Sequence, residues 1–140
     1  MKNLNTLFAA LLASVIFMGY GVQVASAEDA APKGNKLFKA NVVETVDLGP
    51  EIDGMQGRQL RMRMLTIEPG GYIGLHSHKD RPSVAYLLKG TDTVTLEDGT
   101  MKVLHTGDTI SANKGTTHWH RNDGKEPVVL IAVDVFHSAK

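Results

Sequence analysis

The sequence predicts an all-β domain, a small sandwich or barrel, and two observations support this class. Short segments rich in β-branched and aliphatic residues recur along the chain, with Gly, Pro or Asp-Gly between them. After residue 28, no segment of the sequence has a sustained 3.6-residue apolar period. Cysteine is absent, so the apolar core must stabilise the fold without disulfides, and no thiolate can act as a ligand.

The first 27 residues have the pattern of a cleaved signal peptide. Lys2 gives a positive start, residues 7–18 form an apolar run, and residues 25–27 (Ala-Ser-Ala) form a small-x-small cleavage site. The run is shorter than the roughly 20 residues of a transmembrane anchor, which is the alternative interpretation. We therefore expect a periplasmic or secreted protein with no membrane association after cleavage, and a flexible leader over residues 28–36.

Residues 37–140 are expected to form a single domain. Cleavage removes one lysine, which leaves 14 basic against 15 acidic side chains. Binding of nucleic acid depends on a basic surface that neutralises phosphates, so this balance excludes nucleic acid as a partner. The partner class that we expect is a small molecule, as substrate or ligand.

The expected strands follow one another with turn signals between them. In chain order they span residues 37–43, 44–48, 58–67, 84–88, 91–96, 101–104 and 128–135. Asp98-Gly99 predicts a hairpin that joins residues 91–96 to residues 101–104. Pro127 stands at the start of the last strand, where a missing N–H is tolerated.

The segment at residues 58–67 alternates between an apolar and a basic face. The apolar face consists of Leu60, Met62 and Met64, and the basic face consists of Arg61 and Arg63. We expect the methionine face to pack in the core and the arginine face to meet solvent or another subunit. If the arginine face is instead the inner one, it can bind an anionic substrate. Residues 69–71 (Pro-Gly-Gly) are expected to turn the chain after this strand.

Two His-x-His pairs stand well apart in the sequence. They are His76 with His78, and His118 with His120. Strand residues i and i+2 point to the same face, so each pair projects to one side and a barrel can bring the pairs together. Neutral imidazole is the commonest metal ligand near physiological pH. The pairs therefore predict one metal site, with hydrogen-bonded core histidines or paired surface histidines as the alternative.

The stretches around these pairs resemble the two sequence motifs of the cupin superfamily. The first motif is matched by Gly70, His76, His78 and Gly90, and the second by Gly107, Gly115, His118 and Asn122. Asn113 stands where the second motif has Pro, and Ser83 stands where the first has an acidic ligand. The resemblance implies a jelly-roll β-barrel, a small single-domain bacterial cupin, and a homodimer.

The resemblance also implies a metal site formed by His76, His78 and His118. Without the acidic ligand, the charge of the metal is uncompensated, which favours an anionic substrate or hydroxide as the next ligand. Two alternatives stay open: His120 as a fourth ligand in a more closed site, or a metal-free pocket for an organic ligand. Asp80 is a possible substitute carboxylate, but the following Arg-Pro indicates a turn there.

Two functions follow from this site. The first is an exported metal-dependent enzyme acting on a small molecule, for which the resemblance suggests an iron-dependent oxygenase (dioxygenase). The metal would be Fe(II), otherwise Zn, Mn, Ni or Cu, and His120 would be the catalytic acid–base group. The second is a non-catalytic protein that binds a metal or a small ligand, which the missing carboxylate favours.

Overall fold

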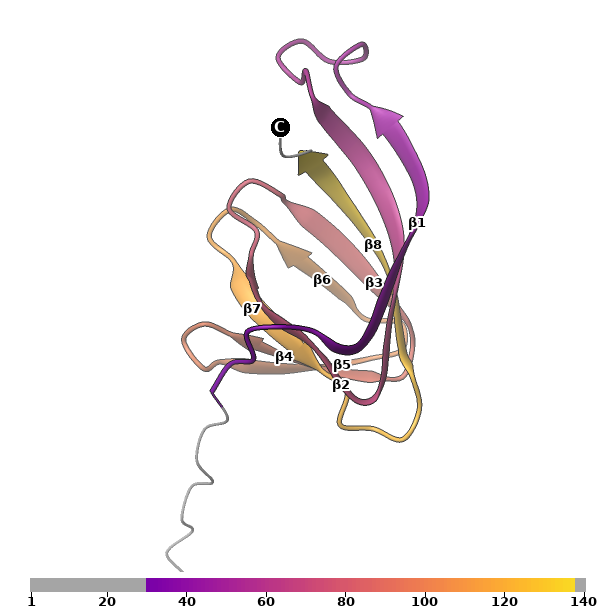
Figure 1. Ribbon diagram of the computed structural model, residues 1–140, viewed down its shortest axis with the longest axis vertical. Coiled ribbons are helices and arrows are strands. Elements are labelled where there is room, and N and C mark those ends of the chain that lie inside the picture. The colour runs from indigo at the N-terminus through magenta and orange to yellow at the C-terminus, as the bar shows by residue number, and fades with distance from the viewer. Residues whose placement is uncertain (1–29, 138–140) are drawn as a thin grey trace, which may run out of the picture.

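The computed structural model describes residues 30–137, and all regular secondary structure in that range is β (Figure 1). The strands are β1 (Lys36–Asp47), β2 (Arg58–Ser77), β3 (Ser83–Lys89), β4 (Thr91–Leu96), β5 (Met101–His105), β6 (Thr109–Ala112), β7 (Thr117–Arg121) and β8 (Val128–His137). Within the described range, no helix has the length and apolarity that crossing a membrane requires. The predicted signal peptide, residues 1–27, lies outside the described residues.

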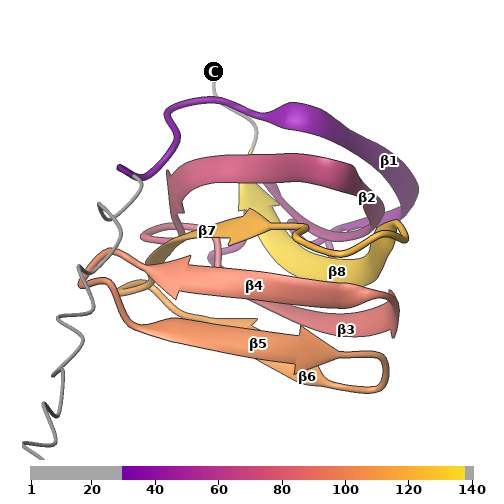
Figure 2. The ribbon, with the colours of Figure 1, turned by 90° about the horizontal axis from the view of Figure 1, so that it is seen from below.

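The strands form one antiparallel sheet that curls into a nearly closed barrel. Seven strands hydrogen-bond in the order β5-β4-β7-β2-β8-β3-β6, and β1 pairs with β2 outside this path. Figure 2 shows β2, β7, β4 and β5 on one side of the interior, with β8, β3 and β6 on the other. The structure therefore confirms the predicted all-β barrel.

β2 is the central strand, and it is longer than the sequence predicted. Its first part pairs with β8 and its last part with β7, so one strand serves both sides of the barrel. Residues 69–71 turn the chain as predicted, but the turn lies within the strand and does not end it. Gly70 has a positive φ of 74°, which favours glycine, and its N–H donates to Asn122 O at 3.0 Å. The backbone pairing thus continues through the bend. The two segments predicted at residues 37–48 likewise form one strand, β1.

The β4–β5 hairpin confirms its prediction. Gly99 has a positive φ of 84°, and its N–H donates to Leu96 O at 3.0 Å. Asp98 Oδ1 accepts a hydrogen bond from Thr100 N at 2.9 Å, which is the usual role of Asp in a tight turn. This hairpin carries one face of the barrel beside β7.

The two faces of β2 lie opposite to the preferred prediction. Leu60 is 41% and Met62 36% exposed, whereas Arg61 and Arg63 face the interior. The reason is Asp134 on β8, which is 1% exposed and stands directly opposite Arg61 in register. A buried charge needs a partner, and this carboxylate supplies one for both arginines. The apolar core comprises Leu65, Ile67, Ile73, Leu87, Val94, Leu104, Val128, Leu130 and Ala132.

The second half of the predicted leader lies against β2. Leu75 N donates to Pro32 O at 2.7 Å, and Gly74 N donates to the side-chain oxygen of Asn35 at 2.9 Å. Lys33 and Asn35 also line the cavity described below. This segment therefore forms part of the wall around the candidate site.

Candidate metal centre

The barrel brings all four histidines of the two pairs together in its interior. His76 lies on β2 and pairs in register with His118 on the neighbouring strand β7. The ring centroid of His118 lies 4.7 Å from the ring centroid of His76, 4.9 Å from that of His78 and 4.6 Å from that of His120. The two pairs, distant in the sequence, thus form one cluster centred on His118.

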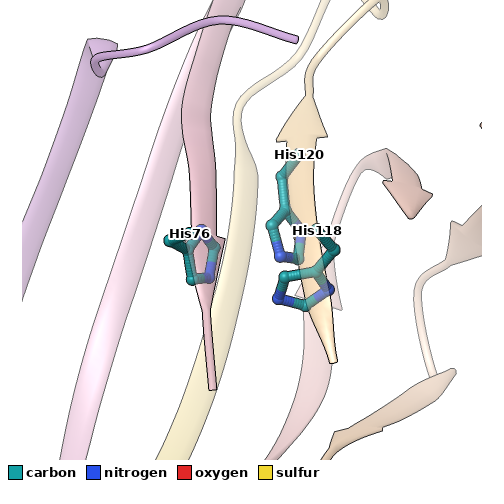
Figure 3. A group of neighbouring side chains, drawn as sticks. All are labelled: His76, His118 and His120. Atoms are coloured by element: carbon teal, nitrogen blue, oxygen red, sulfur yellow. The ribbon is translucent and has the colours of Figure 1, made fainter. Parts of the chain in front are cut away.

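Three of the four rings form a group that could hold a metal ion. His76, His118 and His120 each offer a nitrogen, and these nitrogens all lie within 4.8 Å of one another. In Figure 3, His118 and His120 on β7 and His76 on β2 gather between the two strands. Zn–N bonds are about 2.0–2.1 Å, so a modest inward movement of the rings would place all three nitrogens on one ion.

His78 makes a short nitrogen–nitrogen contact with His118. The two Nε2 atoms are 3.1 Å apart. His78 is not part of the group whose nitrogens all lie within 4.8 Å of one another, so it lies at the edge of the candidate site. The sequence predicted His76, His78 and His118 as ligands and His120 as the catalytic group. The geometry makes His120 a candidate ligand as well, and the ligand set stays a prediction.

Backbone carbonyls set the proton positions on His76 and His78. Nδ1 of His76 lies 2.9 Å from Gly74 O, and Nδ1 of His78 lies 2.8 Å from Arg81 O. A carbonyl oxygen can only accept, so Nδ1 carries the proton in both rings. Nε2 of each ring therefore keeps its lone pair, which is the form that binds a metal.

Asp92 orients His120, and the sequence analysis missed this residue. Nδ1 of His120 donates to Asp92 Oδ2 at 2.7 Å, and the Asp92 side chain is 0% exposed. Histidines that bind a metal usually donate their other N–H to a carboxylate or carbonyl in this way. The one available signal was that Asp92 shares a strand face with the apolar Val94, which is an unusual position for a carboxylate.

Burial keeps the central rings neutral. It lowers the pKa of His76 to about 4 and the pKa of His118 to about 2, and the neighbouring histidines add to both shifts. Among the described residues, Nδ1 of His118 is buried without a hydrogen-bond partner. Neutral imidazoles in a buried cluster fit a transition-metal cation, and a cation bound at Nδ1 of His118 would satisfy that nitrogen.

Neither Ser83 nor Asp80 supplies the missing acidic ligand. Ser83, at the position of the missing acidic ligand, has its Oγ 3.2 Å from His78 Nδ1. Asp80 lies in a turn, its side chain is 68% exposed, and it pairs with Arg58 at 2.7 Å. Asp80 is therefore a turn residue, as preferred from the sequence, and does not replace the carboxylate.

A cavity of about 270 Å³ opens beside the histidines. This is at the small end of the sizes that hold small molecules in proteins, roughly 300–1,000 Å³. All four histidines line it together with Arg63 and Arg81, and Phe38, Leu65, Ile110 and Leu130 provide apolar wall. A metal held by the histidines would therefore face a space that admits a small molecule.

Asp134 anchors a second polar cluster next to this cavity. Its carboxylate accepts hydrogen bonds from Arg61, Arg63 and Arg81 at 2.9–3.2 Å. Burial raises the pKa of Asp134, but the hydrogen bonds and charges of the three arginines outweigh it and hold the pKa below its usual 3.8. Asp134 is therefore ionised at neutral pH.

Comparisons with known proteins agree with this architecture. The model of the Cupin domain family matches residues 63–134. The chain is 32% identical over 79 residues to a mannose-1-phosphate guanylyltransferase of Sinorhizobium fredii, covering 56% of this chain and 15% of that protein. It is 28% identical over 101 residues to germin-like protein subfamily 3 member 3 of Arabidopsis thaliana, covering 69% of this chain and 47% of that protein. The chain thus spans less than half the length of these relatives.

Solved structures share the fold at low sequence identity. An uncharacterised protein with a double-stranded β-helix domain from Klebsiella pneumoniae has a TM-score of 0.60 at 19% identity, over 84% of this chain and 93% of that chain. KdgF from Halomonas sp. has a TM-score of 0.58 at 18% identity, over 73% and 82%. At such identities the likeness shows the fold alone. Because the family model spans just over half of the chain and the barrel matches solved relatives, this chain belongs to the cupin family.

Proposed function

We propose that this cupin is a metal-dependent enzyme that acts on a small molecule, with Fe(II)-dependent oxygenation as the first activity to test. One observation carries the proposal: the nitrogens of His76, His118 and His120 lie within 4.8 Å of one another beside a cavity of about 270 Å³. One relative is named as a guanylyltransferase and the other only as a germin-like protein, so their names support no particular reaction here.

The residues of the site have separate roles in this proposal. His76, His118 and His120 hold the metal, and His78 supports His118 from the side. Bound Fe(II) supplies the capacity to activate oxygen, and other divalent ions supply Lewis-acid chemistry. Asp92 keeps the proton of His120 on Nδ1 and fixes the ring orientation. If the ligands are instead His76, His78 and His118, the Asp92–His120 pair is the group able to accept and return a proton.

A second candidate function is that of a non-catalytic metal-binding protein. The packing of the His78 ring against His76 and His118 favours it, because His78 as a fourth ligand would make a closed site. Structural metal sites are closed, whereas catalytic sites keep an open position for water or substrate.

Metal analysis of the untagged protein tests both candidates. We expect about one equivalent of a divalent transition metal in the wild type and less than about a tenth in His118→Ala, because His118 lies at the centre of the cluster. His105→Ala is the matched control, since His105 is exposed on β5. Less than about half an equivalent of any metal in the wild type, unchanged in His118→Ala, would contradict a metal site.

Reconstitution separates the enzyme from the binder. The metal-free protein is loaded with Fe(II), and oxygen consumption is followed with a panel of small organic acids and their neutral analogues. Metal-dependent oxygen uptake with one substrate class supports the enzyme. Full metal loading with no uptake on any member supports the binding protein.

Export and homodimerisation are further proposals, carried over from the signal-peptide pattern and the cupin resemblance. N-terminal sequencing of the protein recovered from the periplasm should begin at Glu28. Sedimentation of that material should give twice the mass of one mature chain.

A further inference from the structure

The wall of the cavity carries positive charge without a facing carboxylate. Lys33, Arg63 and Arg81 line it, and none of the described lining residues is Asp or Glu. His76 and His118, which share the wall, are neutral, and a bound cation would add its own positive charge. The cavity is therefore a positively charged space at neutral pH.

The Asp134 cluster does not neutralise this charge. Three guanidinium groups share one carboxylate, which leaves two positive charges in excess. Arg61 is fully engaged: its Nε and Nη2 bind both oxygens of Asp134, and its guanidinium lies 3.6 Å over the Phe136 ring. Arg61 is also not among the residues that line the cavity. The excess charge therefore belongs to Arg63 and Arg81.

Arg63 and Arg81 keep donors for another partner. Each gives Asp134 one nitrogen, Nη2 of Arg63 at 2.9 Å and Nη1 of Arg81 at 3.2 Å. Nε of Arg63 is buried and has no hydrogen-bond partner among the described residues. A buried cationic donor without a partner costs free energy, which an anion in the cavity would recover.

We propose that the cavity binds a small organic carboxylate whose anionic group is held by Arg63 and Arg81. The planar guanidinium fork suits a carboxylate, and two such groups beside one space can bind it through several N–H donors. Opposite the charged wall, Phe38, Leu65, Ile110 and Leu130 provide an apolar surface. This surface matches an apolar body on the ligand and disfavours a bare inorganic anion, which would leave it uncovered.

This inference rests on the proposed function in one respect only, namely that the bound acid is the substrate of the enzyme. Binding of the carboxylate needs Arg63 and Arg81 and no metal. It can therefore be tested on the metal-free protein, separately from the metal content.

Calorimetric titration of the EDTA-treated, dialysed protein at low salt tests the proposal with three probes. Benzoate carries the anionic group and an apolar body, benzamide is its neutral counterpart, and inorganic phosphate is an anion without the body. We expect benzoate to bind at least about tenfold tighter than benzamide, as hydrogen bonds to charged groups are worth that much. Benzoate should also bind at least about tenfold tighter than phosphate, because phosphate cannot cover the apolar wall. Arg81→Met should remove the preference for benzoate over benzamide, with the affinity for benzamide unchanged.

Two further variants keep the result interpretable. Arg81 is a quarter exposed, so Arg81→Met should fold, and thermal unfolding checks this. Arg63→Met should also lower the affinity for benzoate by about tenfold or more. Lys39→Met removes an exposed cation from β1 and should change nothing.

The outcomes separate the two ideas. Equal affinity for benzoate and benzamide, or a benzoate affinity that survives both arginine substitutions, would overturn the carboxylate site whatever the metal content. Phosphate bound as tightly as benzoate would overturn the organic ligand. Benzoate binding that depends on Arg63 and Arg81 in a protein that takes up no metal would leave this inference standing and remove the metal-dependent enzyme.

Discussion

The interior of this barrel holds two polar clusters that are satisfied in different ways. In the first, Asp134 is buried and its carboxylate oxygens accept hydrogen bonds from Arg61, Arg63 and Arg81. In the second, the four histidines crowd together, and Nδ1 of His118 has no partner among the described residues. The buried carboxylate of the first cluster is satisfied by the chain itself, whereas the second leaves a ring nitrogen unsatisfied and fits a cation.

The difference separates a contribution to folding from a contribution to binding. A buried carboxylate that three arginines share must stay paired for the barrel to fold, with or without a metal. The rings of His76 and His118 are neutral, so losing either of them from the metal-free protein leaves no buried charge unpaired. Substitutions in the first cluster should therefore lower stability, and substitutions in the second should lower metal affinity.

The largest expected effect is that of Asp134→Asn on stability. Removal of the shared carboxylate leaves three arginine charges partly buried and unpaired, which should cost about 3–5 kcal/mol of unfolding free energy. For a domain of this size each kcal/mol lowers Tm by roughly 4–8 °C, so thermal unfolding of the metal-free protein measures it. Asp80→Asn, which breaks an exposed ion pair with Arg58, should not change Tm measurably. A Tm of Asp134→Asn within about 3 °C of the wild type would contradict the comparison.

Acid should probe the same cluster without a substitution. The folded state holds the pKa of Asp134 below its ordinary 3.8, so pairing adds stability that is complete above the unfolded pKa. This stability is lost as the pH falls below 3.8 and through the folded pKa. Urea unfolding at a series of pH values from 5 to 2 should show this loss in the wild type. The loss should be smaller in Asp134→Asn, and parallel curves for the two proteins would contradict the assignment.

Metal addition should give the next largest effect, and only through the second cluster. A ligand that binds the folded state alone, at 100 times its Kd, stabilises it by about 2.7 kcal/mol. We expect a rise in Tm of this order when a divalent transition metal is added to the metal-free wild type. His118→Ala should show no rise, while His105→Ala should respond like the wild type. A rise that persists in His118→Ala would place the bound metal elsewhere.

The fold was predictable where the signals are local. The signals for the hairpin and the last strand lie within a few residues of the structure they predict, and both elements formed as expected. These signals are the alternating pattern, Asp98-Gly99 and Pro127. The turn at Gly70 was predicted but the continuation of the strand was not, because a glycine with positive φ serves equally well in a turn that ends a strand and in one that lies within it. What decided between them is the pairing of β2 with β7, which depends on residues about fifty positions away.

The site, like the fold, was predictable where the sequence signal is local and not where it depends on distant strands. Each His-x-His pair is a local period-two signal, and the barrel brought both pairs into one cluster. Asp92 and Asp134 were not assigned, because a carboxylate on an apolar strand face, such as Asp92 beside Val94, does not reveal which residue is its buried partner. The roles of these carboxylates depend on which strands become neighbours. Asp134 is also the residue that holds Arg61 and Arg63 on the inner face.

Asp92→Asn should weaken metal binding without the loss of stability expected for Asp134→Asn. The carboxylate holds the Nδ1 proton of His120, whereas an amide can present its NH₂ to that nitrogen and favour the wrong tautomer. Removing such a partner typically lowers metal affinity by about 10–100-fold. Competition with a chromophoric chelator measures the change, and Asp80→Asn is the control. An unchanged affinity would show that His120 is not a ligand, and would support its role as the catalytic group.

The smallest expected effect is that of Ser83→Ala, which tests whether the residue at the family's acidic position still matters. Ser83 Oγ lies 3.2 Å from His78 Nδ1, but Arg81 O lies closer to the same nitrogen, at 2.8 Å. The substitution therefore leaves the ring with its better acceptor and exposes no unsatisfied donor. We expect a loss of about 1 kcal/mol or less in unfolding free energy and a change in metal affinity of no more than about threefold.

Comparison of Ser83→Ala with Asp92→Asn then ranks the two supports of the histidine cluster. Both are measured by the same chelator competition, and both remove one hydrogen-bond partner of a histidine that faces the cavity. A loss of tenfold or more in Ser83→Ala would show that the hydroxyl takes part in the site. A small effect in Ser83→Ala together with the expected large loss in Asp92→Asn would instead mean that the cluster is supported through His120 and the buried Asp92 behind it, and not from the position of the missing acidic ligand.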